Sequence, residues 1–120
     1  MMSKVAGTTA LAAAVTLGIS GDAFAWQSTW KTTGKTQTTK AHSVKKGKHF
    51  LHFGIYGNGR TAFTAKAYKR AKGKDPLIQT IKGKDNGTSW MADWKKYGKG
   101  DYYVVFNYKA KNKKAFGGIQ

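Results

Sequence analysis

The chain has 120 residues, with 20 lysines and two arginines against five aspartates, and it contains no glutamate and no cysteine. Its net charge of +17 indicates a polyanionic partner or environment, because a chain this basic repels itself. The absence of cysteine excludes thiol catalysis, thiolate metal sites and disulfide cross-links, so stability must come from packing.

Residues 1–25 have the three-part pattern of a secretory signal peptide. Lys4 supplies the early positive charge, residues 5–19 are apolar and uncharged, and Ala23 and Ala25 are the small residues that a signal peptidase reads. The apolar run, about 15 residues, is shorter than the ~20 that a spanning helix needs, which favours cleavage after Ala25 over a membrane anchor. We therefore expect a secreted mature chain of one domain, residues 26–120, without a transmembrane segment and still at +17.

The first half of the mature chain predicts short strands. They are a strand over 26–33, a weak or edge strand over 35–43, a turn over 45–48 and a strand over 49–56. In the last of these, Leu51, Phe53 and Ile55 alternate with Phe50 and His52, which places the two sets on opposite faces.

Residues 57–59, Gly-Asn-Gly, are the strongest hairpin signal in the chain, because Asn-Gly accepts the positive φ angles of tight turns. The segment 61–69 is then expected to be the return strand. Its alternation places Lys66 and Tyr68 together on one face.

The second half continues the pattern. It predicts a loop over 70–76, a strand over 77–82, a turn over 83–87, a strand over 101–109, and a basic segment over 109–114 that precedes a last short strand or a frayed end. The continuous apolar side chains of 101–109 indicate a central strand or one covered on both faces. Residues 89–97 fit either a helix or an extended crossover. Regularly spaced strands predict an all-β fold, a small antiparallel β-sandwich (jelly-roll-like) or a barrel.

Candidate catalytic and metal-binding side chains are few. His49 and His52 lie three apart on a predicted strand, so they point to opposite faces and cannot converge on one ion. Three of the four mature aspartates lie beside turn residues, and no nucleophile elbow surrounds a serine. The sequence predicts no cofactor, no metal site and no enzyme, with an RNase-like toxin using a histidine and lysines as the alternative.

Lysines interleaved with aromatic residues are the candidate binding residues. They are Lys66, Tyr68, Trp94, Lys95, Lys96, Tyr97 and Lys99. Flat rings stack on sugars or bases or lie at a lipid headgroup boundary, while ammonium groups pair with phosphate. The preference for lysine over arginine favours diffuse charge attraction over sequence-specific recognition. The competing interpretation is that Trp90, Trp94 and Tyr97 belong to the core and only the lysines are exposed.

Four motifs resemble, in order, the strands of bacterial pre-peptidase C-terminal domains. They are Leu51-x-Phe53, Thr64-x-Lys66-x-Tyr68, Pro76-Leu77 and Gly100-x-Tyr102-Tyr103-Val104-x-Phe106. The resemblance covers about half the chain and implies a small β-sandwich, but the lysine content departs from that usually acidic family, so its targeting roles do not carry over. The chain is also similar to bacteriocins of the lactococcin 972 type in its early Trp26, its lack of cysteine and its aromatic strand near the C-terminus.

Two functional hypotheses follow. The first is a secreted cationic protein that binds anionic cell surfaces or extracellular polymers, with an antibacterial, bacteriocin-like effect. The second is a non-toxic binding or matrix module for acidic polysaccharide, teichoic acid or extracellular DNA, with nucleic acid bound without sequence specificity. An extracellular nuclease or hydrolase is a more distant third class, and the oligomeric state is left open.

Overall fold

The computed structural model describes residues 25–120, so the predicted signal peptide lies outside the described residues except for Ala25. The described chain consists of strands and turns. In chain order the strands are β2 (Trp26–Thr33), β3 (Gln37–Thr38), β4 (His42–Val44), β5 (Gly47–His49), β6 (Leu51–Ile55), β7 (Ala62–Lys69), β8 (Leu77–Lys84), β9 (Trp90–Met91), β10 (Lys95–Tyr97), β11 (Gly100–Asn107) and β12 (Lys111–Ile119). Within this range no helix is long and apolar enough to cross a bilayer. The prediction of an all-β fold is confirmed.

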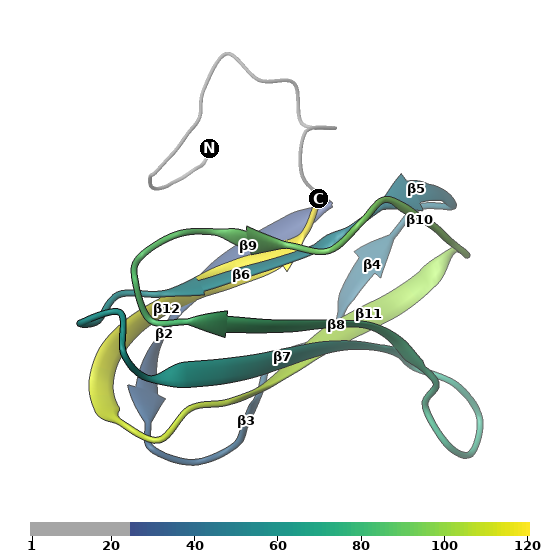
Figure 1. Cartoon of the computed structure of the whole chain (residues 1–120). Helices are drawn as coiled ribbons and strands as arrows, with labels where there is room; N and C mark the ends of the chain where they lie inside the picture. Colours follow the sequence, from purple (N-terminus) through teal and green to yellow (C-terminus); the bar gives the residue numbers. More distant parts are fainter. Residues whose placement is uncertain (1–24) are drawn as a thin grey trace.

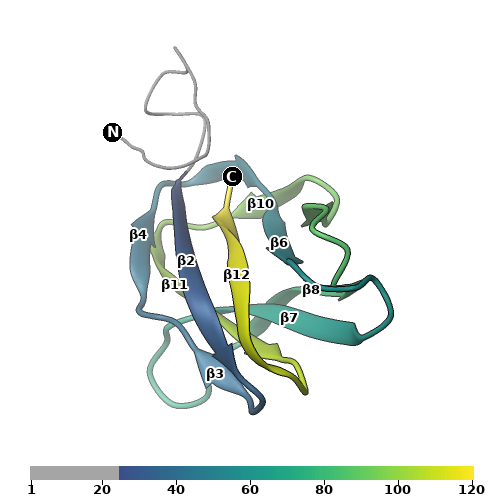
Figure 2. The same cartoon turned by 90° about the vertical axis from the view of Figure 1, so that its left-hand side faces the viewer.

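Two antiparallel sheets face each other like the layers of a sandwich (Figures 1 and 2). The four-stranded sheet has the order β2-β12-β6-β9. The five-stranded sheet has the order β3-β11-β7-β8, and β4 also pairs with β11. Strands β5 and β10 form a separate two-stranded ribbon, which we call the β5–β10 ribbon. The predicted central strand, β11, lies between β7 on one side and β3 and β4 on the other, as its apolar run indicated.

The core lies between the two sheets and is rich in aromatic rings. Phe53 of β6 is at its centre, with ring centroids 4.8 Å from Phe106, 5.5 Å from Phe63 and 5.8 Å from Trp30. A buried aromatic side chain removes ~150–250 Å² from water, so this cluster stabilises the fold without a disulfide. Inward side chains of β2, β6 and β7 form this core, and those of β6 and β7 are the ones that the predicted alternation places on one face.

The predicted hairpin at 57–59 is wrong, although the strand after it exists. β6 pairs with β12 and β9, whereas β7 pairs with β11 and β8, so this loop carries the chain from one sheet to the other. Gly59 has a φ of 79°, and its N–H donates to the backbone oxygen of Asp85 at 3.0 Å. Neighbouring strands occupy both edges of β6, so no edge is left for β7.

The basic segment 109–114 leads into a long strand and not into a frayed end. β12 lies at the centre of the four-stranded sheet, between β2 and β6. Its glycines allow this close packing: a Cβ added at Gly117 would lie 2.5 Å from the backbone oxygen of His52. A β-bulge interrupts the pairing with β2 between Lys111 and Lys114, where Asn112 has a φ of 62°.

The remaining segments refine the predictions. Segment 35–43 forms the short strands β3 and β4 beside β11, in agreement with a weak or edge strand. The predicted turn at 45–48 partly belongs to β5. Segment 89–97 is extended, because its residues pair as β9 and β10, so the helical alternative is wrong.

Candidate functional site

Lys66 and Tyr68 share the outer face of β7, as the alternation predicts. Tyr68 stacks on Tyr103 of the neighbouring β11, with ring centroids 5.6 Å apart and planes 16° from parallel. The guanidinium of Arg70 lies 5.7 Å from the Tyr103 ring centroid. These residues, together with Asp75, form what we call the tyrosine face of the five-stranded sheet.

An acidic group holds the tyrosine face in place. The hydroxyl of Tyr103 donates to Asp75 at 2.6 Å, and the N–H of Ala71 donates to the same carboxylate at 2.9 Å. The hydrogen bond from Tyr103 lowers the pKa of Asp75, and the same bond raises the pKa of Tyr103. Because this carboxylate remains ionised, it offsets part of the positive charge of Arg70.

The second predicted group, Trp94 to Lys99, is divided by the structure. Trp94, Lys95, Lys96 and Lys99 are exposed, but Tyr97 is only 2% exposed. Burial raises the pKa of Tyr97, and its ring lies 4.9 Å from that of Tyr102 in the core. Tyr97 therefore does not offer its ring to a ligand, contrary to its selection as a binding residue.

Gln79, which the sequence analysis did not single out, fixes the segment that leads into the β5–β10 ribbon. Its side-chain oxygen accepts hydrogen bonds from the Tyr97 hydroxyl at 2.7 Å and from the Leu51 N–H at 2.8 Å. Its amide donates to the backbone oxygen of Asp93 at 2.7 Å. These bonds anchor Asp93 and Tyr97, so the backbone that carries Trp94 and Lys95 between them is held in place. No local sequence signal marks a glutamine for this role, since its partners are distant in the chain.

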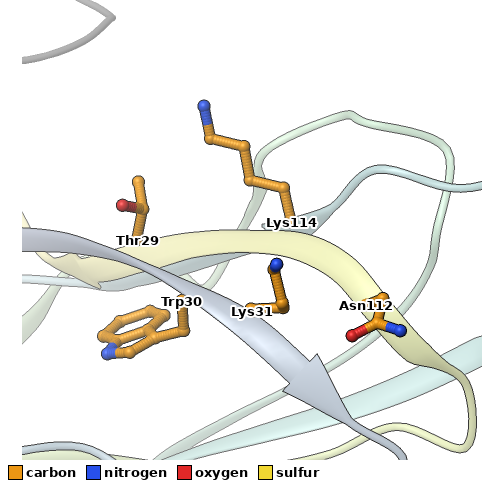
Figure 3. A pocket seen from close by; sticks show the side chains of 5 residues that line it. All are labelled: Thr29, Trp30, Lys31, Asn112 and Lys114. Atoms are coloured by element: carbon orange, nitrogen blue, oxygen red, sulfur yellow. The ribbon is translucent and has the colours of Figure 1, made fainter.

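A cluster of lysines at the β2–β12 bulge is a further basic surface that the sequence analysis missed as a site. Thr29, Trp30, Lys31, Asn112 and Lys114 line a shallow depression of about 350 Å³. Figure 3 shows Thr29 and Lys114 extending to one side of the two strands and the Trp30 ring to the other. The signal for this site was the Lys-Asn-Lys-Lys sequence, because asparagine tolerates the left-handed conformation that a bulge can require.

Thr32 holds the bulge together from the inside. Its buried hydroxyl donates to the backbone oxygen of Ala110 at 2.9 Å and accepts from the N–H of Lys113 at 2.9 Å. These two hydrogen bonds fix the backbone that carries the lysines around the bulge.

The carboxylates are mostly engaged with neutral donors. Asp85 is buried and accepts hydrogen bonds from the Tyr108 hydroxyl and the Thr61 N–H. Asp101 accepts from the Ser43 hydroxyl at 3.1 Å, and Asp75 is held by the tyrosine face as described. Each carboxylate keeps its charge in these contacts, but residues 25–120 contain four aspartates against 21 lysines and arginines, so most of the positive charge is not neutralised.

The histidines serve packing and backbone contacts. His42 stacks on Trp26 at 4.3 Å, and burial together with the charge of Lys40 lowers its pKa. Burial lowers the pKa of His52 to about 4. The two ring nitrogens of His49 lie within 3.1 Å of backbone oxygens. Among residues 25–120, no three histidine and aspartate side chains are gathered closely enough to hold a metal ion.

No family model matches the chain, and no curated protein or solved structure matches it either.

Proposed function

We propose that this chain is a secreted, non-enzymatic protein that uses a small β-sandwich to bind anionic polymers or anionic cell surfaces. One observation carries the proposal. Every lysine of residues 25–120 is exposed except the half-buried Lys66 and Lys69, while most carboxylates are occupied by hydroxyl and amide donors. The molecule therefore presents ammonium groups on both sheets, on the β5–β10 ribbon and at the bulge.

Such a distribution suits diffuse binding. Lysine is a compact point charge on a flexible stem, so it attracts phosphate, sulfate or carboxylate groups without demanding a fixed geometry. A polyanion can thus lie on the protein in several registers, and each contact displaces counterions that had condensed on the polymer. Nucleic acid would be bound in the same way, without sequence specificity.

The test is the salt dependence of binding. The protein recovered from culture medium, whose N-terminus we expect to be Trp26, is titrated with heparin and with teichoic acid over a range of sodium chloride concentrations. If about four anionic groups are neutralised, affinity should fall on the order of a hundredfold between about 50 and 200 mM salt. Neutral dextran is the control polymer. Affinity that barely changes with salt would contradict the electrostatic account.

A second experiment separates an antibacterial protein from a matrix module. Live bacteria are exposed to the purified protein while retention on the cells and viability are measured together. Retention with loss of viability supports the antibacterial form of the proposal. Retention without loss supports the non-toxic binding module, and the absence of retention contradicts both.

A further inference from the structure

The outer face of the four-stranded sheet combines exposed apolar side chains with a basic margin. Among residues 25–120 the exposed large hydrophobic side chains are Tyr56, Leu77, Met91 and Trp94. Three of them belong to this face. Met91 lies opposite His52, whose side chain points away from the inward Leu51 and Phe53 but is itself buried, so Met91 and not His52 is exposed here.

Aromatic contacts extend the face in both directions along β6. Trp94 meets Phe50 edge-on, with ring centroids 4.6 Å apart. Beyond the other end of β6, Tyr56 lies 5.4 Å from Phe116 of β12. Trp94, Met91 and Tyr56 are 63%, 65% and 52% exposed.

Two buried glycines lie in the middle of this face. Gly54 of β6 and Gly118 of β12 occupy outward positions without a side chain, and a Cβ added at Gly54 would collide with the Phe116 ring. Lys31 and Lys114, opposite each other on β2 and β12, border the face with positive charge. We call this surface the apolar face: Tyr56, Met91 and Trp94 are its exposed residues, they lie over the buried Phe50 and Gly54 and the half-buried Phe116, and the two lysines border it.

We propose that the apolar face docks on a lipid bilayer that contains anionic phospholipids. This inference rests on the proposed function and narrows it to one partner. Tryptophan and tyrosine rings favour the headgroup level of a bilayer, where one end is apolar and the other is wet. A lysine that borders the face is attracted to the negative surface of an anionic membrane.

The same features disfavour other occupants. A second copy would bring the lysine borders of two +17 chains together, and like charges oppose that contact. A polysaccharide or nucleic acid would gain little from the Met91 thioether, which is a poor hydrogen-bond partner, and the imidazole of His52 opposite it is buried. A bilayer alone offers both an apolar interior for Met91 and Trp94 and phosphate for the lysines.

The experiment is co-sedimentation of the secreted protein with vesicles. Vesicles of mixed phosphatidylglycerol and phosphatidylcholine are compared with vesicles of phosphatidylcholine alone. Met91→Ala is the test variant, and Leu77→Ala is its matched control, because Leu77 is a similarly exposed apolar residue of the other sheet. Met91→Ala should lower partitioning to the anionic vesicles on the order of fivefold, given ~0.8 kcal/mol per buried methylene, and Leu77→Ala should leave it unchanged.

Tryptophan fluorescence gives a second measurement that does not depend on affinity. Binding to anionic vesicles should shift the emission to the blue, and Trp94→Phe should remove most of that shift. Equal partitioning of the Met91→Ala and Leu77→Ala variants, or a shift that persists in Trp94→Phe, would overturn the inference.

The inference and the proposed function can fail separately. Met91→Ala should elute from heparin at the same salt concentration as the unmodified protein. Retention on heparin without vesicle binding would overturn the inference alone, whereas loss of both would overturn the proposed function too. A sedimentation experiment that finds a dimer dissociated by Met91→Ala would show that a second copy covers the face, and this too would overturn the inference.

Discussion

Replacing Asp85 with alanine should lower the free energy of unfolding by about 2–4 kcal/mol. The substitution removes the acceptor of the Tyr108 hydroxyl and of the Thr61 N–H. Both bonds lie where the chain crosses from one sheet to the other, and Gly57 packs directly against the same carboxylate. The backbone oxygen of Asp85 also accepts a hydrogen bond from the Gly59 N–H, so both the side chain and the backbone of this residue hold the loop.

The magnitude follows from the burial of the two donors. The Tyr108 hydroxyl is in the core, where losing a partner costs about 1–3 kcal/mol. Thr61 is half-buried, so water replaces part of the lost bond and the cost is about 0.5–1.5 kcal/mol. For a domain of this size the combined loss corresponds to a melting temperature lower by roughly 10–25 °C.

The assay is urea unfolding followed by circular dichroism. Asp93→Ala is the matched control, because Asp93 is exposed and its removal changes the net charge by the same amount. The control should unfold at nearly the same urea concentration as the unmodified protein. If the two variants unfolded alike, the loop would not depend on the buried carboxylate and the reasoning would be refuted.

The same site predicts the sign of a pH effect. Burial by itself would raise the pKa of Asp85, but the hydrogen bonds from Tyr108, Thr61 and Gly59 hold it below the ordinary value of 3.8. A lowered pKa in the folded state contributes stability above the unfolded pKa, and that stability is lost as the pH falls through the folded value. Between about pH 5 and pH 3 the unmodified protein should therefore lose more stability than Asp85→Ala.

Substitutions at three further positions test the packing that supports the candidate surfaces, each by urea unfolding. Thr32→Val should cost about 1–3 kcal/mol, because the hydroxyl both donates and accepts at the bulge; an unchanged midpoint would contradict this. Gly83→Ala should cost about 1–3 kcal/mol, since the added Cβ would lie 2.7 Å from Trp90 and 2.8 Å from Phe63; a stability gain would contradict it. Asn112→Val should cost about 1–2 kcal/mol at its φ of 62°, whereas Asn112→Gly should be tolerated, and equal effects would show that the left-handed backbone is unimportant.

The strands were predictable where one face is buried and the other is not. In β2 and β7 the inward residues alternate with exposed or half-buried ones, and this alternation is a local property of the sequence. The apolar run of β11 also marked a central strand, because both of its edges are paired. Each of these patterns reflects which faces of the strand are buried, so it can be recognised without knowing which strands are its neighbours.

Strand partners could not be predicted in the same way. The Gly-Asn-Gly segment at 57–59 has hairpin chemistry, but whether β6 and β7 pair depends on β12, which lies more than 50 residues later in the chain. The central position of β12 could not be predicted, because lysines and glycines fill the positions where a central strand usually has apolar side chains. Its central place depends on the close approach that its glycines permit.

The candidate site shows the same division. High lysine exposure follows from charge alone, since burying an ammonium group without a partner is costly. Which aromatic ring is exposed does not follow. Trp94 and Tyr97 lie three residues apart, yet the Trp94 ring is exposed whereas the Tyr97 ring is buried. The Tyr97 hydroxyl donates a hydrogen bond to Gln79 of β8. Only the tertiary structure distinguishes them.

The placement of the carboxylates explains how a chain at +17 stays folded and still presents its charge. Asp75 and Asp85 accept hydrogen bonds from tyrosine hydroxyls, so they stabilise the fold, and with four aspartates against 21 lysines and arginines in residues 25–120 most of the surface charge is left unneutralised. The lysines in turn project from strands whose inward side chains already form the core. Changes to the carboxylates should therefore alter stability more than binding, and changes to exposed lysines should alter binding more than stability. This separation is what allows a binding surface based on net charge to be tested by substitution without unfolding the domain.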